Sequence, residues 1–156
     1  MRKFEKISEQ EYEKVLKEKC NYEDIKLPTR STKNSAGYDF ISPFDFTLMP
    51  GETIKVPSGI KVAMNEDEFL AILVRSSMGF KYNIRLCNQV GIVDSDYYNN
   101  PDNEGHMFIA LKNEGEKEYS VKKGEKYAQG IFQKFLVTDD DNAEGERLGG
   151  FGSTNK

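Results

Sequence analysis

The chain has 156 residues, a formal net charge of −4 and a sequence pI near 5.2. This length suits one domain with a sizeable core, and the acidic balance argues against polymeric DNA or RNA as a partner. No apolar run approaches membrane-spanning length and no signal core follows the first residues. We therefore expect a soluble, cytoplasmic protein without a membrane partner.

The cysteines and the single histidine argue against further classes of site. Cys20 and Cys87 form no CxxC pair, and His106 has no second metal-type ligand nearby. A zinc site of the usual kind and a structural disulfide are therefore not expected. His106 could serve a Ser-His-Asp hydrolase, but the alternating run after it favours a histidine at a strand edge.

Residues 8–19 are predicted to form a short helix, within an extension that covers residues 1–21. Ser8 and Glu11 have the spacing of a capping box, and Ile7 and Tyr12 that of a hydrophobic staple. We expect this helix to pack on the surface of the main domain. A helix that binds a partner is the alternative.

From residue 22 the apolar residues alternate instead of recurring at helical spacing. Strands are predicted at residues 25–27, 46–48, 53–56, 59–64, 69–74, 84–88, 106–112, 119–121 and 127–137. Many short strands with turn clusters and no helix between them indicate an all-β sandwich or barrel over residues 22–138. The acidic run at 139–146 reads as a solvated tether, and residues 139–156 form a flexible, glycine-rich tail.

The stretch Gly91–Tyr97 offers a candidate catalytic base. The apolar residues Ile92 and Val93 lead directly into Asp94, which predicts a buried strand that breaks into a polar turn. A carboxylate at such a break can be held rigidly and partly desolvated, as a general base for water activation requires. An ordinary turn is the alternative, since Asp, Ser and Asn are common turn formers.

Two more stretches carry polar residues at strand ends or inside strands. Arg75, Ser76, Ser77 and Gly79 follow the predicted strand 69–74 and combine a guanidinium with hydroxyls, which suits phosphate. A helix capped by Ser76 or Ser77 is the alternative. Gln129 interrupts an apolar strand, so its amide is either a satisfied core group or a ligand contact.

The glycine-rich tail has an aromatic ring, hydroxyls and a flanking arginine. Such a segment holds no fixed fold alone, because glycine loses the most entropy on ordering. A ligand could order it, with Phe151 against a base and with phosphate bound by Arg147, Gly152, Ser153 and Thr154. A disordered terminus is the alternative.

Together with Ser35–Asp39, these stretches resemble the five motifs of the trimeric dUTP nucleotidohydrolases (dUTPases), in the same order and over residues 35–154. The five are Ser-Ala-Gly-Tyr-Asp, Arg-Ser-Ser-x-Gly, Gly-Ile-Val-Asp-Ser-Asp-Tyr, Ala-Gln-x-Ile-Phe and Gly-Gly-Phe-Gly-Ser-Thr. The resemblance implies a jelly-roll-like β-barrel subunit in a homotrimer with active sites at subunit interfaces. It also implies hydrolysis of dUTP to dUMP and pyrophosphate, with Mg²⁺ held by the triphosphate.

The resemblance further implies a role for each matching residue. Asp94 corresponds to the base for the water that attacks the α-phosphorus, Tyr97 to the ring that excludes a 2′-hydroxyl, and Asn88 to the reader of the uracil edge. The phosphates would be held by Arg75, Ser76, Ser77, Gly79 and Gln129, with Asp39 in support. The lid would consist of Phe151 over the base and of Arg147, Gly152, Ser153 and Thr154 on the phosphates.

This chain departs from the family pattern at several points. Arg147 and Phe151 are one residue closer together than usual. The glycine that usually follows shortly after the tyrosine of the third motif is absent, and residues 99–105 lengthen that connection. In the fourth motif, Lys126, Tyr127 and Gly130 replace other residues. We expect these departures to alter packing more than chemistry.

Two rival functions remain on the same scaffold. The related dCTP deaminases also carry an Arg-Ser-Ser stretch, but they lack a lid ending of this kind. A non-catalytic, nucleotide-sensing regulator is the rival of a different class. The polar residues retained in all five motifs favour the hydrolase.

Overall fold

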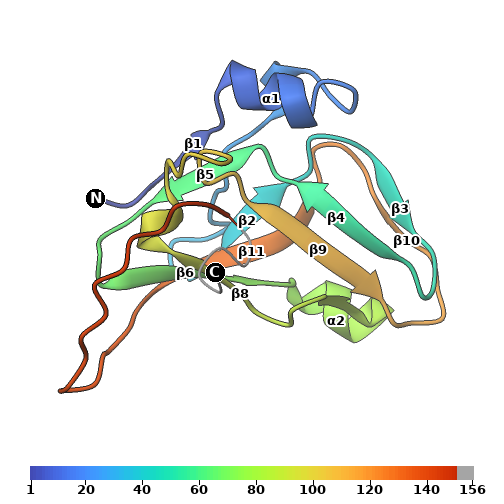
Figure 1. Ribbon diagram of the computed structural model, residues 1–156. Coiled ribbons are helices and arrows are strands. Elements are labelled where there is room, and N and C mark those ends of the chain that lie inside the picture. The colour runs from blue at the N-terminus through green and yellow to red at the C-terminus, as the bar shows by residue number, and fades with distance from the viewer. Residues whose placement is uncertain (151–156) are drawn as a thin grey trace.

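The computed structural model describes residues 1–150, and its strands pair antiparallel throughout (Figure 1). The strands are β1 (Lys3–Lys6), β2 (Tyr38–Ile41), β3 (Phe46–Leu48), β4 (Thr53–Pro57), β5 (Ile60–Ala63), β6 (Glu68–Leu73), β7 (Ile84–Leu86), β8 (Gly91–Asp94), β9 (Phe108–Asn113), β10 (Tyr119–Val121) and β11 (Lys126–Lys134). The largest sheet has the order β2-β11-β6-β8, and the next has the order β4-β9-β7. The pairs β1-β5 and β10-β3 are smaller. The predicted all-β class is confirmed.

The core draws its side chains from both larger sheets. Phe40 of β2 and Leu70 of β6 belong to the same buried cluster as Ile109 and Leu111 of β9. On β9, buried and half-buried residues alternate along the strand, as expected when one face of a strand packs inward. Burial of this alternating set fixes the strand register, because a slip by one residue would turn every apolar side chain outward.

Several elements differ from the sequence prediction. A seven-residue helix, α2 (Ser76–Tyr82), lies between β6 and β7, where the sequence offered a helix only as the alternative to a phosphate site. Residues 25–27 form no strand and instead follow a 3-10 turn, η1 (Tyr22–Asp24). The strands β1 and β2 were not predicted. β1 has a single apolar side chain, Phe4, which packs against Tyr38, Phe40 and Phe132.

The N-terminal helix α1 (Glu9–Val15) is shorter than predicted and packs on the barrel (Figure 1). Ile7 and Leu16 are fully buried beneath it. The Ser8 hydroxyl accepts a hydrogen bond from the backbone N–H of Glu11 at 3.1 Å, which is one half of the expected capping box. The other half is wrong, because the backbone N–H of Ser8 donates to Glu104 while the Glu11 carboxylate lies against His106.

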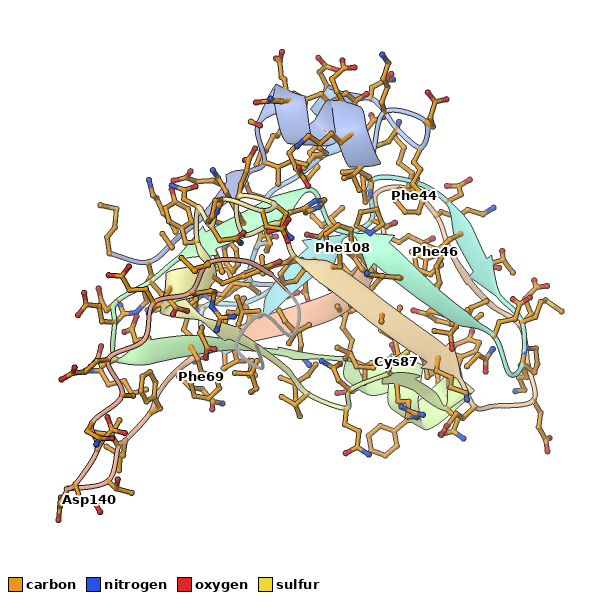
Figure 2. The ribbon with its side chains drawn as sticks, viewed as in Figure 1. Phe44, Phe46, Phe69, Cys87, Phe108 and Asp140 are labelled. Atoms are coloured by element: carbon orange, nitrogen blue, oxygen red, sulfur yellow. The ribbon has the colours of Figure 1, made fainter. Side chains whose placement is uncertain are left out.

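Beyond β11 the chain has no regular structure within the described residues. Residues 139–146 are exposed and form a projecting loop, with Asp140 near its tip (Figure 2). The chain then returns to the end of β8 (Figure 1). In the described part of the chain, no helix has both the length and the apolar character needed to cross a membrane.

Candidate active site

Asp94 is the last residue of β8, and the chain passes from it directly into a 3-10 turn, η2 (Ser95–Tyr97). The predicted strand that breaks at a polar triplet is therefore confirmed, but its predicted burial is wrong, because β8 is an edge strand and only Gly91 in it is buried. Asp94 pairs in register with Phe69 at the start of β6. This pairing fixes the backbone of the candidate base in the antiparallel ladder, so its position does not depend on a mobile loop.

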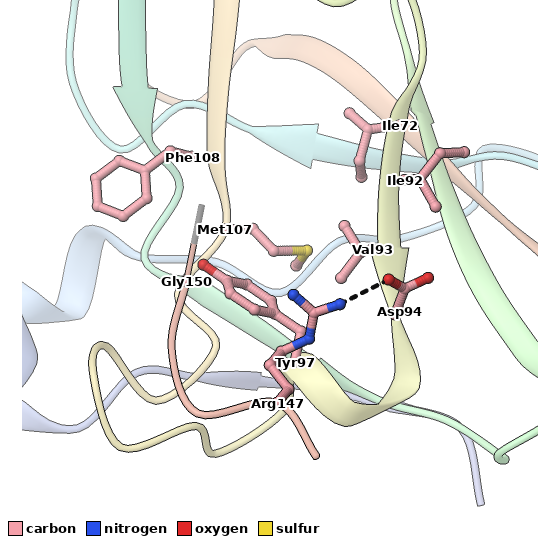
Figure 3. A pocket seen from close by; sticks show the side chains of 9 residues that line it. All are labelled: Ile72, Ile92, Val93, Asp94, Tyr97, Met107, Phe108, Arg147 and Gly150. Atoms are coloured by element: carbon pink, nitrogen blue, oxygen red, sulfur yellow. Dashed lines mark hydrogen bonds and ion pairs between the residues drawn. The ribbon is translucent and has the colours of Figure 1, made fainter. Parts of the chain in front are cut away.

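A cavity opens beside Asp94 and is closed on one side by the ring of Tyr97 (Figure 3). Its other walls include Val93, Met107 and Phe108. The Tyr97 hydroxyl donates to the carbonyl of His106 at 2.8 Å and accepts from Asn103 Nδ2 at 2.9 Å. Burial raises the pKa of Tyr97, so the ring is a neutral, anchored wall of the cavity.

Arg147 lies across the mouth of this cavity (Figure 3). Its Nη2 is 2.8 Å from Asp94 Oδ2 and its Nε is 2.7 Å from Asp96 Oδ1. The hydrogen bond to Asp96 raises the pKa of Arg147 above its ordinary value. The Asp94 side chain is 50% exposed. In the single chain, water therefore still reaches about half of the candidate base.

A second cavity adjoins the first and is lined by Asn88 together with Cys87 and Leu86. The two cavities share Ile72 and Phe108 as walls. Asn88 therefore lines a cavity next to the one lined by Tyr97 and Asp94. Together the two cavities offer an amide, an aromatic wall and a carboxylate, which suit the base, the sugar and the phosphate of a nucleotide.

A third cavity lies where β6 ends and α2 begins, and is lined by Arg75, Ser76, Ser77, Gln129 and Asp39. Arg75 occupies the position before the helix, and no side chain caps it. The alternative in which Ser76 or Ser77 caps the helix is therefore wrong. Both serines are exposed at the first turn of α2, where their hydroxyls face the cavity.

Asp39 organises this third cavity. Its carboxylate lies 3.2 Å from Arg75 Nε and 3.0 Å from Lys126 Nζ, and it accepts from the Ser31 hydroxyl at 2.7 Å. Burial alone would raise the pKa of Asp39, but the Ser31 hydroxyl and the Lys126 ammonium outweigh it and hold the pKa below its ordinary range. The carboxylate therefore stays charged and fixes the direction of the Arg75 guanidinium.

Gln129 is oriented by two contacts. Its Nε2 donates to the carbonyl of Val74 at 3.0 Å, and its Oε1 lies against Gly37, where an added Cβ would approach to 2.2 Å. A side chain at position 37 would therefore displace the Gln129 amide, which the turn-like sequence around Gly37 did not reveal. Ser31 and Lys126 were also missed, because only the folded chain brings them to Asp39.

The remaining predicted site residues lie elsewhere. Gly79 is exposed on α2, and an added Cβ there would meet nothing within 4 Å, so the structure gives no reason for a glycine. Phe151, Gly152, Ser153 and Thr154 lie outside the described residues. The described residues thus form two groups, one at Asp94 and one at Arg75.

The two groups lie at opposite ends of β6. Asp94 pairs with Phe69, whereas Gln129 pairs with Leu73, two residues before Arg75. Phe69 and Arg75 are therefore separated by roughly 20 Å along an extended strand. The Asp94 cavity and the Arg75 cavity share no lining residue.

This arrangement defines a class: an all-β protein with a strand-end carboxylate beside two adjoining cavities and a separate cluster of arginine, serine and glutamine. Comparison with known proteins gives the family. The dUTPase family model matches residues 23–155. The chain belongs to the dUTPase family, and it is an enzyme of the dUTP diphosphatase class.

Individual relatives agree with this assignment. The chain is 48% identical over 132 residues to the deoxyuridine 5'-triphosphate nucleotidohydrolase of Lactococcus lactis, with 83% of this chain and 88% of that protein covered. A dUTPase structure from Streptococcus mutans superposes with a TM-score of 0.70 at 36% identity, covering 87% of this chain and 98% of that one. A dUTPase from phage phi11 of S. aureus has the same fold at 18% identity, with 93% and 97% covered and a TM-score of 0.69. A structure of that phage enzyme reveals a structural Mg(II) ion.

Proposed function

We propose that the protein hydrolyses dUTP to dUMP and pyrophosphate, with Asp94 as the base that activates the attacking water. Water would attack the α-phosphorus, and its proton would pass to the Asp94 carboxylate as the bond to the bridging oxygen breaks. Tyr97 would pack on the deoxyribose and exclude a 2′-hydroxyl. Asn88 would bind the uracil edge. The observation that carries this proposal is that the cavity lined by Tyr97 and Asp94 adjoins the cavity lined by Asn88.

The phosphates would bind at the cluster of Arg75, Ser76, Ser77 and Gln129. The Arg75 guanidinium, held by Asp39 at 3.2 Å, supplies a fixed cation, and the serine hydroxyls supply donors. In this proposal Asp39 acts on the substrate only through Arg75. The pKa of Asp39 is held low, so its carboxylate stays charged over the neutral pH range. This permanent charge supports the role.

The separation of the two groups supports a site shared between subunits. The base must lie one water molecule from the phosphorus that Ser76 approaches, and the short side chains of Asp94 and Ser76 do not span roughly 20 Å. We therefore propose a homotrimer in which Asp94 of one subunit faces Arg75 of another. The lid residues Phe151 to Thr154 would come from a subunit other than the one that supplies Asp94.

Arg147 must leave Asp94 before turnover, because it covers the side of the carboxylate that faces the cavity. A guanidinium held by two carboxylates at 2.8 Å and 2.7 Å has a strong competitor in a triphosphate, which offers more negative charge and bidentate oxygens. We propose that the γ-phosphate of the site which this tail covers draws Arg147 from Asp94 and that the tail closes with it. Substrate binding at that site would then be coupled to exposure of the Asp94 that Arg147 leaves.

Magnesium would enter with the substrate. Among the described residues there is no group of three or more His, Cys, Asp or Glu side chains that could hold a metal ion, and Asp39 is already bonded to Arg75 and Lys126. The residues present fit a Mg²⁺ ion whose ligands are phosphate oxygens and water. When bound, the ion would neutralise charge on the triphosphate.

The cellular role follows from the chemistry. Hydrolysis of dUTP would keep uracil out of DNA and would supply dUMP for dTTP synthesis. We place the enzyme in the cytoplasm, where deoxynucleotides are made and where Cys20 and Cys87, both free thiols, would remain reduced.

Release of pyrophosphate from dUTP, UTP, dCTP and dTTP tests the proposed activity. We expect rapid turnover of dUTP alone, because in this proposal Tyr97 excludes ribose and Asn88 binds the uracil edge. Ammonia should be measured in the same samples. Release of ammonia from dCTP would show a deaminase, and tight binding without release of either product would show a regulator.

Asp94→Asn tests the base. The amide keeps the shape of the side chain but cannot take a proton, so kcat should fall by about 10²–10⁴-fold with little change in nucleotide binding. Asp96→Asn is the matched control, because Asp96 also binds Arg147 but is not a base in this mechanism. A variant of Asp94 that retains more than about a tenth of kcat would remove Asp94 from the role.

A further inference from the structure

The N-terminal extension contacts one loop of the barrel, residues 98–106, which follows the sugar-facing Tyr97. The backbone N–H of Ser8 donates to Glu104 Oε1 at 2.9 Å, and the Ser8 hydroxyl donates to Glu104 Oε2. Glu11 Oε1 lies 3.3 Å from Nδ1 of the buried His106. The extension thus binds both residues that flank Gly105.

A third contact joins the extension to the other end of the same loop. The Tyr98 hydroxyl donates to the Glu5 carboxylate at 2.9 Å and 3.0 Å. Glu5 belongs to β1, which pairs with β5 from Lys3 to Lys6. The extension is therefore fixed in the barrel by a strand ladder, and it contacts the loop at both ends.

The loop in turn fixes the Tyr97 ring. Asn103 Nδ2 donates to the Tyr97 hydroxyl at 2.9 Å, while that hydroxyl donates to the carbonyl of His106 at 2.8 Å. Gly105 has a φ of +86°, and a Cβ there would lie 2.5 Å from the carbonyl oxygen of Tyr97. Asn100 completes the loop by accepting from the N–H groups of Asp102 and Asn103.

From these contacts we infer that the N-terminal extension is a positioning element of the substrate pocket, in which Glu104, held by Ser8, fixes the loop that anchors Tyr97. This inference rests on the proposed function, since it assigns to Glu104 the selectivity between deoxyribose and ribose. Asp94 is held separately, by the β6–β8 ladder. Loss of the Glu104 contacts should therefore disturb Tyr97 and leave the base in place.

Glu104 also links this loop to the barrel strand β5. Lys61 Nζ reaches Glu104 Oε1 at 3.4 Å and Asn99 Oδ1 at 2.8 Å, so Glu104 also gathers a contact from β5. Burial would raise the pKa of Glu104, but hydrogen bonds from Ser8 and the charge of Lys61 keep the pKa below its ordinary value. Glu104 therefore remains an ionised acceptor that serves the extension and the barrel at once.

The test compares dUTP and UTP turnover in full-length Glu104→Ala and wild-type enzyme. We expect the ratio of kcat/KM for dUTP to that for UTP to fall roughly tenfold, because a small displacement of a positioning group has a large effect on fit. The kcat at saturating dUTP should change by about twofold or less, since Asp94 stays in its ladder. Glu104→Gln keeps an oxygen for the Ser8 N–H and should retain most of the selectivity.

Two controls separate positioning from general loss of structure. Glu13→Ala removes an exposed carboxylate of α1 that forms an ion pair with Lys17, and it should leave the ratio unchanged. In a Tyr97→Phe background, Glu104→Ala should have no further effect on the ratio, because the anchored hydroxyl is already gone. An additive loss in that background would overturn the inference, as would an unchanged ratio in Glu104→Ala itself.

Hydrogen exchange gives a readout without nucleotide. The N–H groups of Asp102, Asn103 and Gly105 are bonded to side chains of the loop, and they should exchange faster in Glu104→Ala than in wild type. Should Glu104→Ala not fold, Ser8→Ala removes one of the same contacts and should lower the ratio by a smaller factor. A wild-type enzyme that does not prefer dUTP would overturn the proposed function, whereas unchanged exchange would overturn the inference alone.

Discussion

Tyr127 replaces the aliphatic residue usual at its position in the fourth motif, and the structure shows how the fold accommodates the larger ring. The register of β11 against β2 shifts between Lys126 and Ala128, so that Tyr127 is the extra residue of a β-bulge. The bulge turns Tyr127 into the core, where it meets Phe46 edge-on with ring centroids 6.1 Å apart. Lys126 can then reach Asp39 at 3.0 Å.

The Tyr127 hydroxyl is the weak point of this arrangement. The residue is fully buried, and among the described residues its oxygen has no hydrogen-bond partner. An unsatisfied buried hydroxyl costs about 1–3 kcal/mol. We expect Tyr127→Phe to raise the free energy of unfolding by about 1 kcal/mol, which corresponds to roughly 2–4 °C in Tm for a chain of this size.

Thermal unfolding of the purified enzyme measures this gain. Tyr22→Phe is the matched control, because the Tyr22 hydroxyl donates to the carbonyl of Ile7 at 2.8 Å and its loss should lower the stability by about 1 kcal/mol. Equal losses in both variants would show that the Tyr127 hydroxyl has a partner in the assembled enzyme.

At the scale of elements, α1 is joined to the barrel by a buried pair, Glu11 and His106. His106 Nε2 accepts from the N–H of Gly59 at 2.9 Å, so its Nδ1 carries the proton and faces Glu11. Burial lowers the pKa of His106 from 6.5 to about 4, and burial raises the pKa of Glu11. The ring is therefore neutral at pH 7. His106 is fully buried and lies before β9, which corrects the expectation of a histidine at a strand edge.

These shifts predict how stability depends on pH. Between pH 6.5 and about 4 the unfolded chain binds a proton at His106 and the folded chain does not. The free energy of unfolding therefore decreases as the pH falls. This decrease amounts to at most about 3 kcal/mol. The raised pKa of Glu11 acts in the opposite direction, because the folded state then takes up its proton first on acidification.

Urea unfolding at several pH values from 7 to 4 measures this dependence. His106→Gln keeps an acceptor for Gly59 and a donor for Glu11 but does not titrate. As the pH falls, the free energy of unfolding of wild type should therefore decrease relative to that of the variant. Parallel pH curves would show that His106 is not the group responsible.

The sequence predicted the elements whose apolar residues alternate and missed those that depend on distant partners. β3 and β10 were found at their observed bounds because apolar and polar side chains alternate in each. β1 contains one apolar residue, Phe4, and forms because β5 offers an edge. α2 was offered only as an alternative, because Ser76 and Ser77 carry no apolar period and Gly79 disfavours a helix.

The candidate site divides in the same way. Asp94 and Arg75 were identified because polar residues directly follow apolar strands, and this pattern is local. The Ser31–Lys126–Asp39 cluster was not, since its members are 95 residues apart at the extremes. From the sequence, the loop at 98–106 was recognised only as a longer connection after the third motif. Nothing in its own sequence indicates that Asn103 binds the Tyr97 hydroxyl.

At the scale of the whole molecule, the single chain leaves large apolar side chains in water. Phe80 on α2 is 91% exposed, and Ile92 on the edge strand β8 is 57% exposed. Leu136, just beyond β11, is 96% exposed. Scattered exposed residues are common, but here they lie close to both halves of the candidate site. This distribution agrees with a subunit whose site is completed by another copy.

Mixing of inactive chains tests this arrangement. Asp94→Asn chains and Arg75→Ala chains should each form inactive homotrimers. In mixed closed trimers a site works only when its Asp94 donor carries Arg75→Ala and its Arg75 donor carries Asp94→Asn. Each condition holds for half of the chains at equal expression and random mixing, so about a quarter of the sites should be intact. Activity near that fraction of wild type is the expected result.

The control is a chain that carries both substitutions, mixed with wild type, and the trimers must be shown to be mixed by a tag on one chain. Background activity in confirmed Asp94→Asn and Arg75→Ala trimers would mean that one chain supplies both groups, against the separation along β6.

Chains that end at Glu146 can then replace the Arg75→Ala chains to locate the lid. Activity of about a quarter would show that the tail crosses to another subunit on closure. Background activity would show that the tail closes over its own Asp94, as Arg147 does in Figure 3, and would leave the role of Asp94 as base unchanged.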